Sequence, residues 1–171
     1  KYYVANLLNG SAAALQYLKE HQLFEYDDLA AKTDAATERF HTLAGDIQQT
    51  EAELSRVSDL MAAVVQYAKT RPVFDGYKAA KYSRKYLAEH EAELADYRAA
   101  KATMAELLGG EKLPKMDVLK EKRRQLAARK KALYLEYRKA QQDMRELVAV
   151  KGSVDHLRGL TDNQRNKEQA R

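Results

Sequence analysis

Apolar residues in the first half of the chain recur in alternating steps of three and four, which is the spacing of a coiled-coil seam. The positions of this first seam are Phe40, Leu43, Ile47, Thr50, Leu54, Val57, Met61, Val64 and Ala68. The pattern predicts a helix over about residues 28–70, in which Thr50 is the one polar member of the seam. Asp27 and Asp28 are favourable at its N-terminus. Pro72 is expected to stop or bend it, because proline lacks a backbone donor.

A second repeat, of seven residues, runs through the last third of the chain. Its positions are Leu119, Leu126, Leu133, Ala140, Leu147 and Val154, and Tyr137 and Met144 fill complementary positions. Cations fill three others, Arg123, Lys130 and Lys151. The repeat predicts a helix over about residues 117–157, with a seam that is weaker and more solvated than the first one. Gly159 is expected to close it, and residues 159–171 are expected to form a disordered polar tail.

Between the two seams the pattern predicts a third helix over residues 84–108. Its apolar side would consist of Leu87, Leu94, Tyr97, Met104 and Leu107 or Leu108. Ser83 is a candidate N-cap, with Tyr82 and Leu87 in the positions of a hydrophobic staple. The pair Gly109-Gly110 suits the C-terminal end, since glycine tolerates the left-handed conformation of a C-cap. Residues 73–82 are expected to form a short helix or a turn, and residues 111–116 a loop containing Pro114.

The chain begins with one or two short predicted helices in residues 1–24. The triplet Asn9-Gly10-Ser11 is expected to break the pattern, with Ser11 as N-cap of a helix over Ala12 to His21. The expected organisation is therefore a short helical segment over 1–24, an elongated domain over 25–158 and the tail over 159–171.

The three apolar stripes must be buried somewhere, and two arrangements bury them. The first is an all-α fold in which the two long helices form an antiparallel coiled-coil hairpin, with the 84–108 helix packed along it. The second is a coiled coil between chains, which makes a homodimer. Periodicity does not choose between them.

Composition and motifs favour long helices and exclude several kinds of reactive and metal-binding site. The chain has 171 residues with no Cys, no Trp, 2 Pro, 7 Gly and 32% charged residues. Without Cys there are no disulfides, thiolate ligands or Cys nucleophiles, which is compatible with a reducing cytoplasm. The four histidines fall into no metal-binding spacing, and no phosphate loop or nucleophile elbow is present. No apolar run is long enough for a membrane span. We therefore expect no enzyme activity, no cofactor and no metal site in these residues.

Positive charge is concentrated in two stretches that also carry aromatic residues. Residues 115–139 hold 10 cations and 3 anions, and residues 67–86 interleave tyrosines with cations. Cations attract phosphates and aromatic rings stack on bases, so the mixture suits nucleic acid. The candidate contacts are Arg71, Lys78, Lys81, Tyr82, Arg84 and Lys85, followed by Arg123, Arg124, Lys130 and Lys131. For residues 67–86 the competing interpretation is a packed helix corner with buried rings. For residues 115–139 it is the solvated surface of a coiled coil.

Several short motifs add a resemblance to a known family. The matches are Tyr77-Lys78, Lys81-Tyr82-Ser83-Arg84-Lys85, Glu89-His90-Glu91, Leu108-Gly109 and Leu113-Pro114, with a later KKALYLEYRKAQQDMRELVAVKGSVDHLRG and an N-terminal YVANLLNGSAAALQYLKEHQLFEYDDL. Over about residues 2–160 the chain resembles the region after the nuclease domain in relaxase/mobilization nucleases of conjugative and mobilizable elements from Firmicutes. The acidic residues before the histidine and the tail depart from that pattern.

The resemblance implies a non-catalytic C-terminal accessory domain, excised from a longer bacterial cytoplasmic protein whose nicking chemistry lies upstream. It implies transfer-origin DNA, single- or double-stranded, as the leading partner. Relaxosome or secretion-channel proteins are the further partners that it suggests. The alternative from a different class is a structural coiled-coil module that dimerises or binds protein without contacting DNA.

Overall fold

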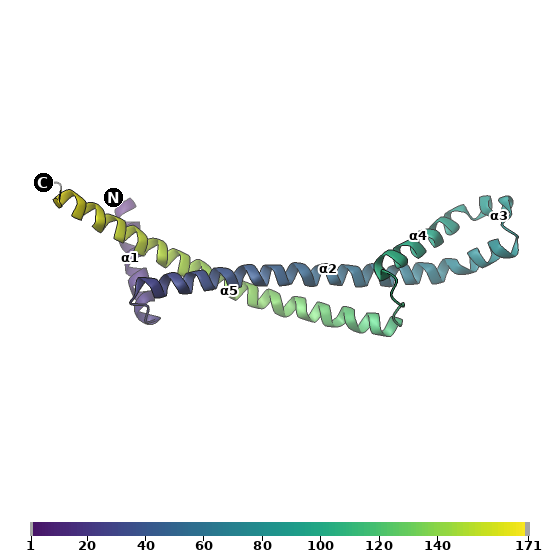
Figure 1. Cartoon of the computed structure of the whole chain (residues 1–171), viewed down its shortest axis with the longest axis horizontal. Helices are drawn as coiled ribbons and strands as arrows, with labels where there is room; N and C mark the ends of the chain where they lie inside the picture. Colours follow the sequence, from purple (N-terminus) through teal and green to yellow (C-terminus); the bar gives the residue numbers. More distant parts are fainter. Residues whose placement is uncertain (1, 170–171) are drawn as a thin grey trace. The chain divides into compact units, whose positions relative to one another are not determined.

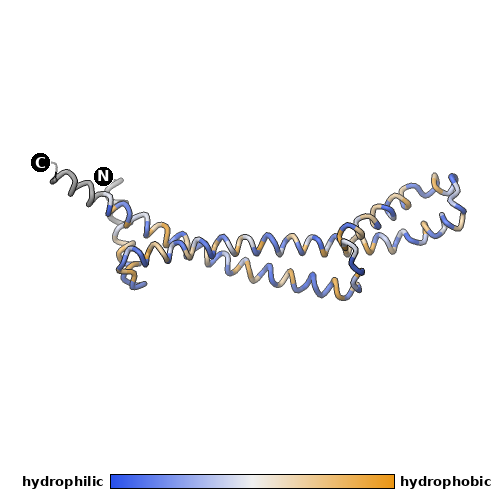
Figure 2. Tube along the Cα trace, in the orientation of Figure 1, coloured by the Kyte–Doolittle hydropathy of each residue, from blue (hydrophilic) through white to orange (hydrophobic). Residues whose placement is uncertain are grey.

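The computed structural model describes the backbone of residues 2–169 and the side chains of residues 10–159. All of the regular elements in that range are helices, labelled in Figure 1: α1 Tyr2–Glu20, α2 Tyr26–Ala79, α3 Arg84–Glu89, α4 Glu91–Leu108 and α5 Met116–Gln169. The predicted all-α class is therefore confirmed. Apolar and polar residues alternate along α2 and α5 (Figure 2), as expected of helices that bury one stripe.

The helices run further than the helix-breaking residues predicted. α1 continues through Gly10 and Ser11 without a break, and α2 passes Pro72. α5 passes Gly159 to Gln169, so residues 159–169 are helical where a disordered tail was expected, and residues 170–171 lie outside the described part. A single glycine costs about 1 kcal/mol and a proline about 3 kcal/mol in a helix. Neighbouring helix formers and packing outweigh these costs here.

The predicted 84–108 helix is interrupted once. His90 leaves the helical region with φ −126° and ψ 28°, and it separates α3 from α4. Its ring packs against Tyr86, with the centroids 4.3 Å apart. Ser83 does stand at the N-cap of α3, but its side chain makes no capping hydrogen bond. Gly109 ends α4 at φ 56°, which confirms the glycine C-cap.

The chain forms two compact units, which we describe separately. The terminal unit comprises residues 1–46 and 133–171, and the central unit comprises residues 47–132. The core of the terminal unit contains Ala14, Leu23, Leu29, Leu147 and Val150, from α1, the α1–α2 connection, α2 and α5. Tyr26 donates a 2.6 Å hydrogen bond to Asp155, and the Phe40 and Tyr137 rings lie 4.9 Å apart. As residue numbers rise along α2, the numbers of the contacting residues on α5 fall, so these two segments are antiparallel.

In the central unit α2 has two antiparallel partners. Lys130 of α5 pairs with Glu51 at 2.8 Å, whereas Gln66 donates a 2.9 Å hydrogen bond to Asp96 of α4. The predicted first seam is right as far as Val57, which is buried. Beyond it the seam is wrong: Leu60, Ala63 and Thr70 are buried, Met61 and Val64 are half-buried, and Ala68 is exposed. The buried residues move to another face of α2 at this point, because α2 packs against α5 before it and against α4 after it.

The second seam is confirmed at its main positions. Leu119, Leu126, Ala140 and Leu147 are buried, and Leu133 and Val154 are half-buried. The buried positions of both stripes are covered within one chain, so these positions need no second chain to cover them.

Candidate nucleic-acid interface

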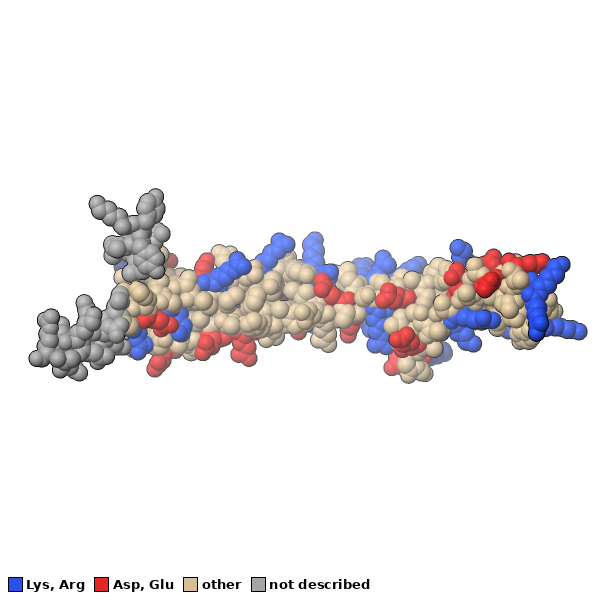
Figure 3. Space-filling view, turned by 90° about the horizontal axis from the view of Figure 1, so that it is seen from above, with Lys and Arg blue, Asp and Glu red and all other residues tan. Residues whose placement is uncertain are grey.

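Six of the ten predicted contact residues lie in one place, the turn from α2 to α3 in the central unit. We call residues 71–89 the basic corner. This segment carries five cations and two anions: Arg71, Lys78, Lys81, Arg84 and Lys85 against Asp75 and Glu89. Figure 3 shows Lys and Arg side chains gathered at this end, beside acidic ones. The corner therefore has a net charge of +3 within 19 residues.

The turn itself is a Schellman motif built without glycine. The N–H of Lys81 bonds to the Lys78 carbonyl at 2.9 Å, and the N–H of Tyr82 bonds to the Tyr77 carbonyl at 3.0 Å. Lys81 and Tyr82 have φ values of 49° and 58°. The left-handed region costs a residue with a side chain about 1–2 kcal/mol, which is why glycine usually stands at the Lys81 position. The motif turns the chain sharply and places both side chains at the tip.

The rings of the corner form a packed layer beneath this tip. Tyr77 lies edge-on to Tyr82 at 5.2 Å and stacks on Tyr86 at 6.1 Å. The Tyr86 hydroxyl donates a 3.2 Å hydrogen bond to the Val73 carbonyl, and it lies where a Cβ would stand at Gly76. Tyr82 remains 59% exposed. Its ring contacts Tyr77 edge-on, and the exposed part of the ring leaves one side of the aromatic layer open to solvent.

The cations of the corner divide into paired and unpaired groups. Asp75 lies 3.7 Å from Arg71 and 3.6 Å from Lys78, and Lys85 reaches Glu89 at 4.0 Å. These are exposed pairs within one helix, and such pairs contribute little. Lys81 and Arg84 are exposed and form no ion pair with any described residue. The unpaired charge therefore stands on either side of Tyr82.

The second predicted cluster lies elsewhere in the central unit and is partly neutralised. Arg124 makes two 2.9 Å hydrogen bonds to Glu121, which raise the pKa of the guanidinium and lower that of the carboxyl. Lys130 is bound to Glu51, whereas Arg123 and Lys131 are exposed. This segment of α5 packs near Val57 of α2, about twenty residues from the corner, which is about 30 Å along a helix. The structure does not bring the two clusters together.

Sequence reasoning missed the residues that hold the corner in shape. Gly76 and Tyr86 are ten residues apart on different helices, so their close approach appears only once α3 folds back on α2. His90 then packs on Tyr86 from four residues further along the chain. Gly76 was the one available signal, since a glycine in a helical segment costs about 1 kcal/mol relative to alanine and such a residue has a packing reason.

Two further kinds of site concern the described part of the chain, a metal centre and a membrane span. No group of three or more potential metal ligands occurs among residues 10–159. Within the described helices no stretch is both long enough and apolar enough to cross a membrane. Neither a family model, nor a curated protein, nor a solved structure matches the chain.

Proposed function

We propose that this chain is a non-catalytic helical module that binds nucleic acid through the basic corner, as an accessory domain of a relaxase-type protein. One observation carries the proposal. Lys81 and Arg84, which form no ion pair with a described residue, flank the exposed ring of Tyr82 on a turn held in a costly conformation. Such backbone strain persists at functional sites more often than elsewhere.

Each part of the corner has a physical task in this proposal. Lys81, Arg84 and Lys85 attract backbone phosphates and release counterions, which makes binding weaken as salt rises. Tyr82 offers a ring face on which an unpaired base can stack, and such stacking contributes about 1–3 kcal/mol per base. Arg71 and Lys78 are partly neutralised by Asp75 and contribute less. Arg123 and Lys131 supply a second phosphate contact along a longer strand.

The proposal is tested by fluorescence anisotropy with single-stranded and duplex oligonucleotides over a salt series. Replacing Lys81, Arg84 and Lys85 together by Ala should weaken binding to both. The slope of log affinity against log salt should fall by about 2 for single strands and by about 3 for duplex, because each phosphate contact contributes about 0.7 or 0.9. A transfer-origin sequence in the oligonucleotide set tests the relaxase part.

The control removes the same charge from another face of the central unit. Lys101, Lys112 and Lys115 are exposed and form no ion pair with a described residue, so their joint replacement by Ala is matched in charge. If both triple variants lose affinity equally, binding follows net charge and not the corner. If neither changes it, the corner is not the interface.

A further inference from the structure

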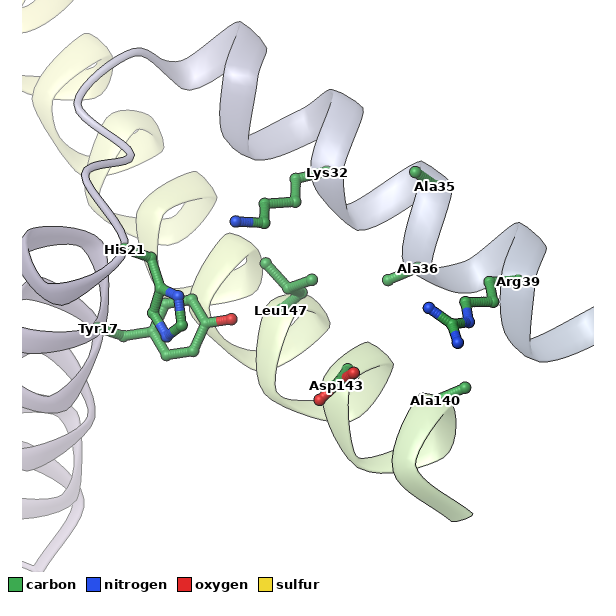
Figure 4. A pocket seen from close by; sticks show the side chains of 9 residues that line it. All are labelled: Tyr17, His21, Lys32, Ala35, Ala36, Arg39, Ala140, Asp143 and Leu147. Carbon is green, nitrogen blue, oxygen red and sulfur yellow. The ribbon is translucent and has the colours of Figure 1, made fainter. Parts of the chain in front are cut away.

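A pocket of about 370 Å³ opens in the terminal unit between α1, α2 and α5 (Figure 4). It exists because the facing helices present small residues there. Ala35 and Ala36 of α2 and Ala140 of α5 leave a space that Leu147 only partly fills. Its volume is in the ~300–1,000 Å³ range of small-molecule sites.

Charged groups of both signs stand on opposite walls of this pocket. Lys32 and Arg39 come from α2, and Asp143 faces them from α5 (Figure 4). The third wall is the Tyr17 ring of α1, stacked on His21 with centroids 4.1 Å apart. Burial first, then Glu146 and Asp143, raise the pKa of Tyr17, so its hydroxyl stays a hydrogen-bond donor at neutral pH.

These charges contribute little to holding the helices together. Lys32 and Asp143 form no ion pair with any residue that the structure describes. Arg39 approaches Glu136 at 3.8 Å, but both side chains are more than half exposed, so that pair is weak. Two cations and one carboxylate are therefore left to interact with a ligand.

We propose that this pocket binds a free amino acid with an apolar side chain. The ligand's carboxylate would lie between Lys32 and Arg39, and its ammonium group would lie on Asp143. The side chain would cover the alanines and Leu147. A simple anion would leave Asp143 without a partner, and a simple cation would leave both basic residues without one. A zwitterion satisfies both walls, and charge-assisted hydrogen bonds are the strong ones. The site is independent of the nucleic-acid proposal, because it lies in the other unit.

Isothermal titration of the full chain with three ligands of one shape tests the assignment. L-phenylalanine carries both charges, hydrocinnamate lacks the ammonium group, and phenethylamine lacks the carboxylate. L-phenylalanine should bind best, and loss of either charge should weaken binding at least about tenfold, as one lost charge-assisted hydrogen bond does. Equal binding of all three, or no binding of any, overturns the proposal.

Variants then assign the charges to residues. Lys32→Ala with Arg39→Ala should remove the preference for L-phenylalanine over phenethylamine, and Asp143→Asn its preference over hydrocinnamate. Ala36→Leu fills the space without changing charge and should weaken all three ligands. Arg145→Ala removes an exposed cation of α5 outside the pocket and should change nothing. Circular dichroism confirms that each variant is folded. An Asp143→Asn variant that is folded and keeps its preference contradicts the site.

Discussion

At the scale of single residues, Gly76 is the position on which the corner depends. The helix places no ordinary requirement for glycine there. The requirement comes from Tyr86, whose hydroxyl occupies the space of a Cβ while it donates to the Val73 carbonyl. The Tyr86 ring has little room to move, because it lies between Tyr77 and His90.

We expect Gly76→Ala to destabilise the protein by about 1–2 kcal/mol, although alanine is the better helix former by about 1 kcal/mol. The clash displaces Tyr86 and breaks its hydrogen bond, and that loss exceeds the gain. Urea unfolding measures the difference. Gly45 is the matched control, because an added Cβ there meets no side chain within 4 Å among the described residues. Gly45→Ala should stabilise by up to about 1 kcal/mol. The same sign for both variants would contradict this account.

At the scale of elements, two helices end in the same way without glycine. At the end of α1, the Leu23 N–H bonds to the Leu18 carbonyl at 2.9 Å, and Gln22 has φ 55°. At the end of α2, Lys81 takes the equivalent place. In both motifs an apolar contact accompanies the turn, through Leu18 and Leu23 in the first and through Tyr77 and Tyr82 in the second. The packing of these side chains offsets the cost of the left-handed residue.

Two substitutions at Lys81 distinguish the effect of the backbone strain from the effect of the positive charge. Lys81→Gly should raise the free energy of unfolding by about 1 kcal/mol, because glycine accepts the left-handed conformation. It should also weaken nucleic-acid binding and reduce the salt slope by about 0.7–0.9. Lys81→Ala removes the same charge but keeps the strain, so it should weaken binding equally without stabilising. Denaturation and the salt titration together give both readouts. Stabilisation by Lys81→Ala as well would show that the lysine charge, and not the backbone, destabilises the turn.

The element boundaries show what the sequence could and could not predict. The heptad stripes predicted the long helices and most of their buried residues, since periodic burial is a property of one helix. The ends at Pro72 and Gly159 were wrong, because local propensity costs only about 1–3 kcal/mol and neighbouring residues can outweigh it. The sequence pattern did not show that the buried face of α2 changes near Leu60. That change depends on where α4 replaces α5 as the packing partner of α2. The charges of the corner were visible, and their ion pairs follow the i,i+3 and i,i+4 spacing of one helix, but the left-handed turn at Lys81 and Tyr82 was not visible.

At the scale of the whole molecule, burial bears on the alternative of a coiled-coil dimer. The seam residues Leu43, Leu126 and Leu147 are buried within a single chain. The exposed apolar residues of the two long helices that the structure describes, among them Val65, Val118 and Leu135, are scattered positions of the kind that is normal for a protein surface. These seam residues are therefore already covered within one chain.

We therefore expect the protein to be a monomer of 19.5 kDa in solution. Light scattering coupled to size exclusion, over about a hundredfold range of concentration, measures this mass. Leu135→Ser removes the most exposed large hydrophobic side chain among the described residues of α5 and should leave the mass unchanged. A mass that doubles with concentration in the original chain but not in Leu135→Ser would locate an interface on that face of α5. Doubling in both would place the contact between chains elsewhere than at Leu135. That result would favour the structural coiled-coil module over the nucleic-acid module.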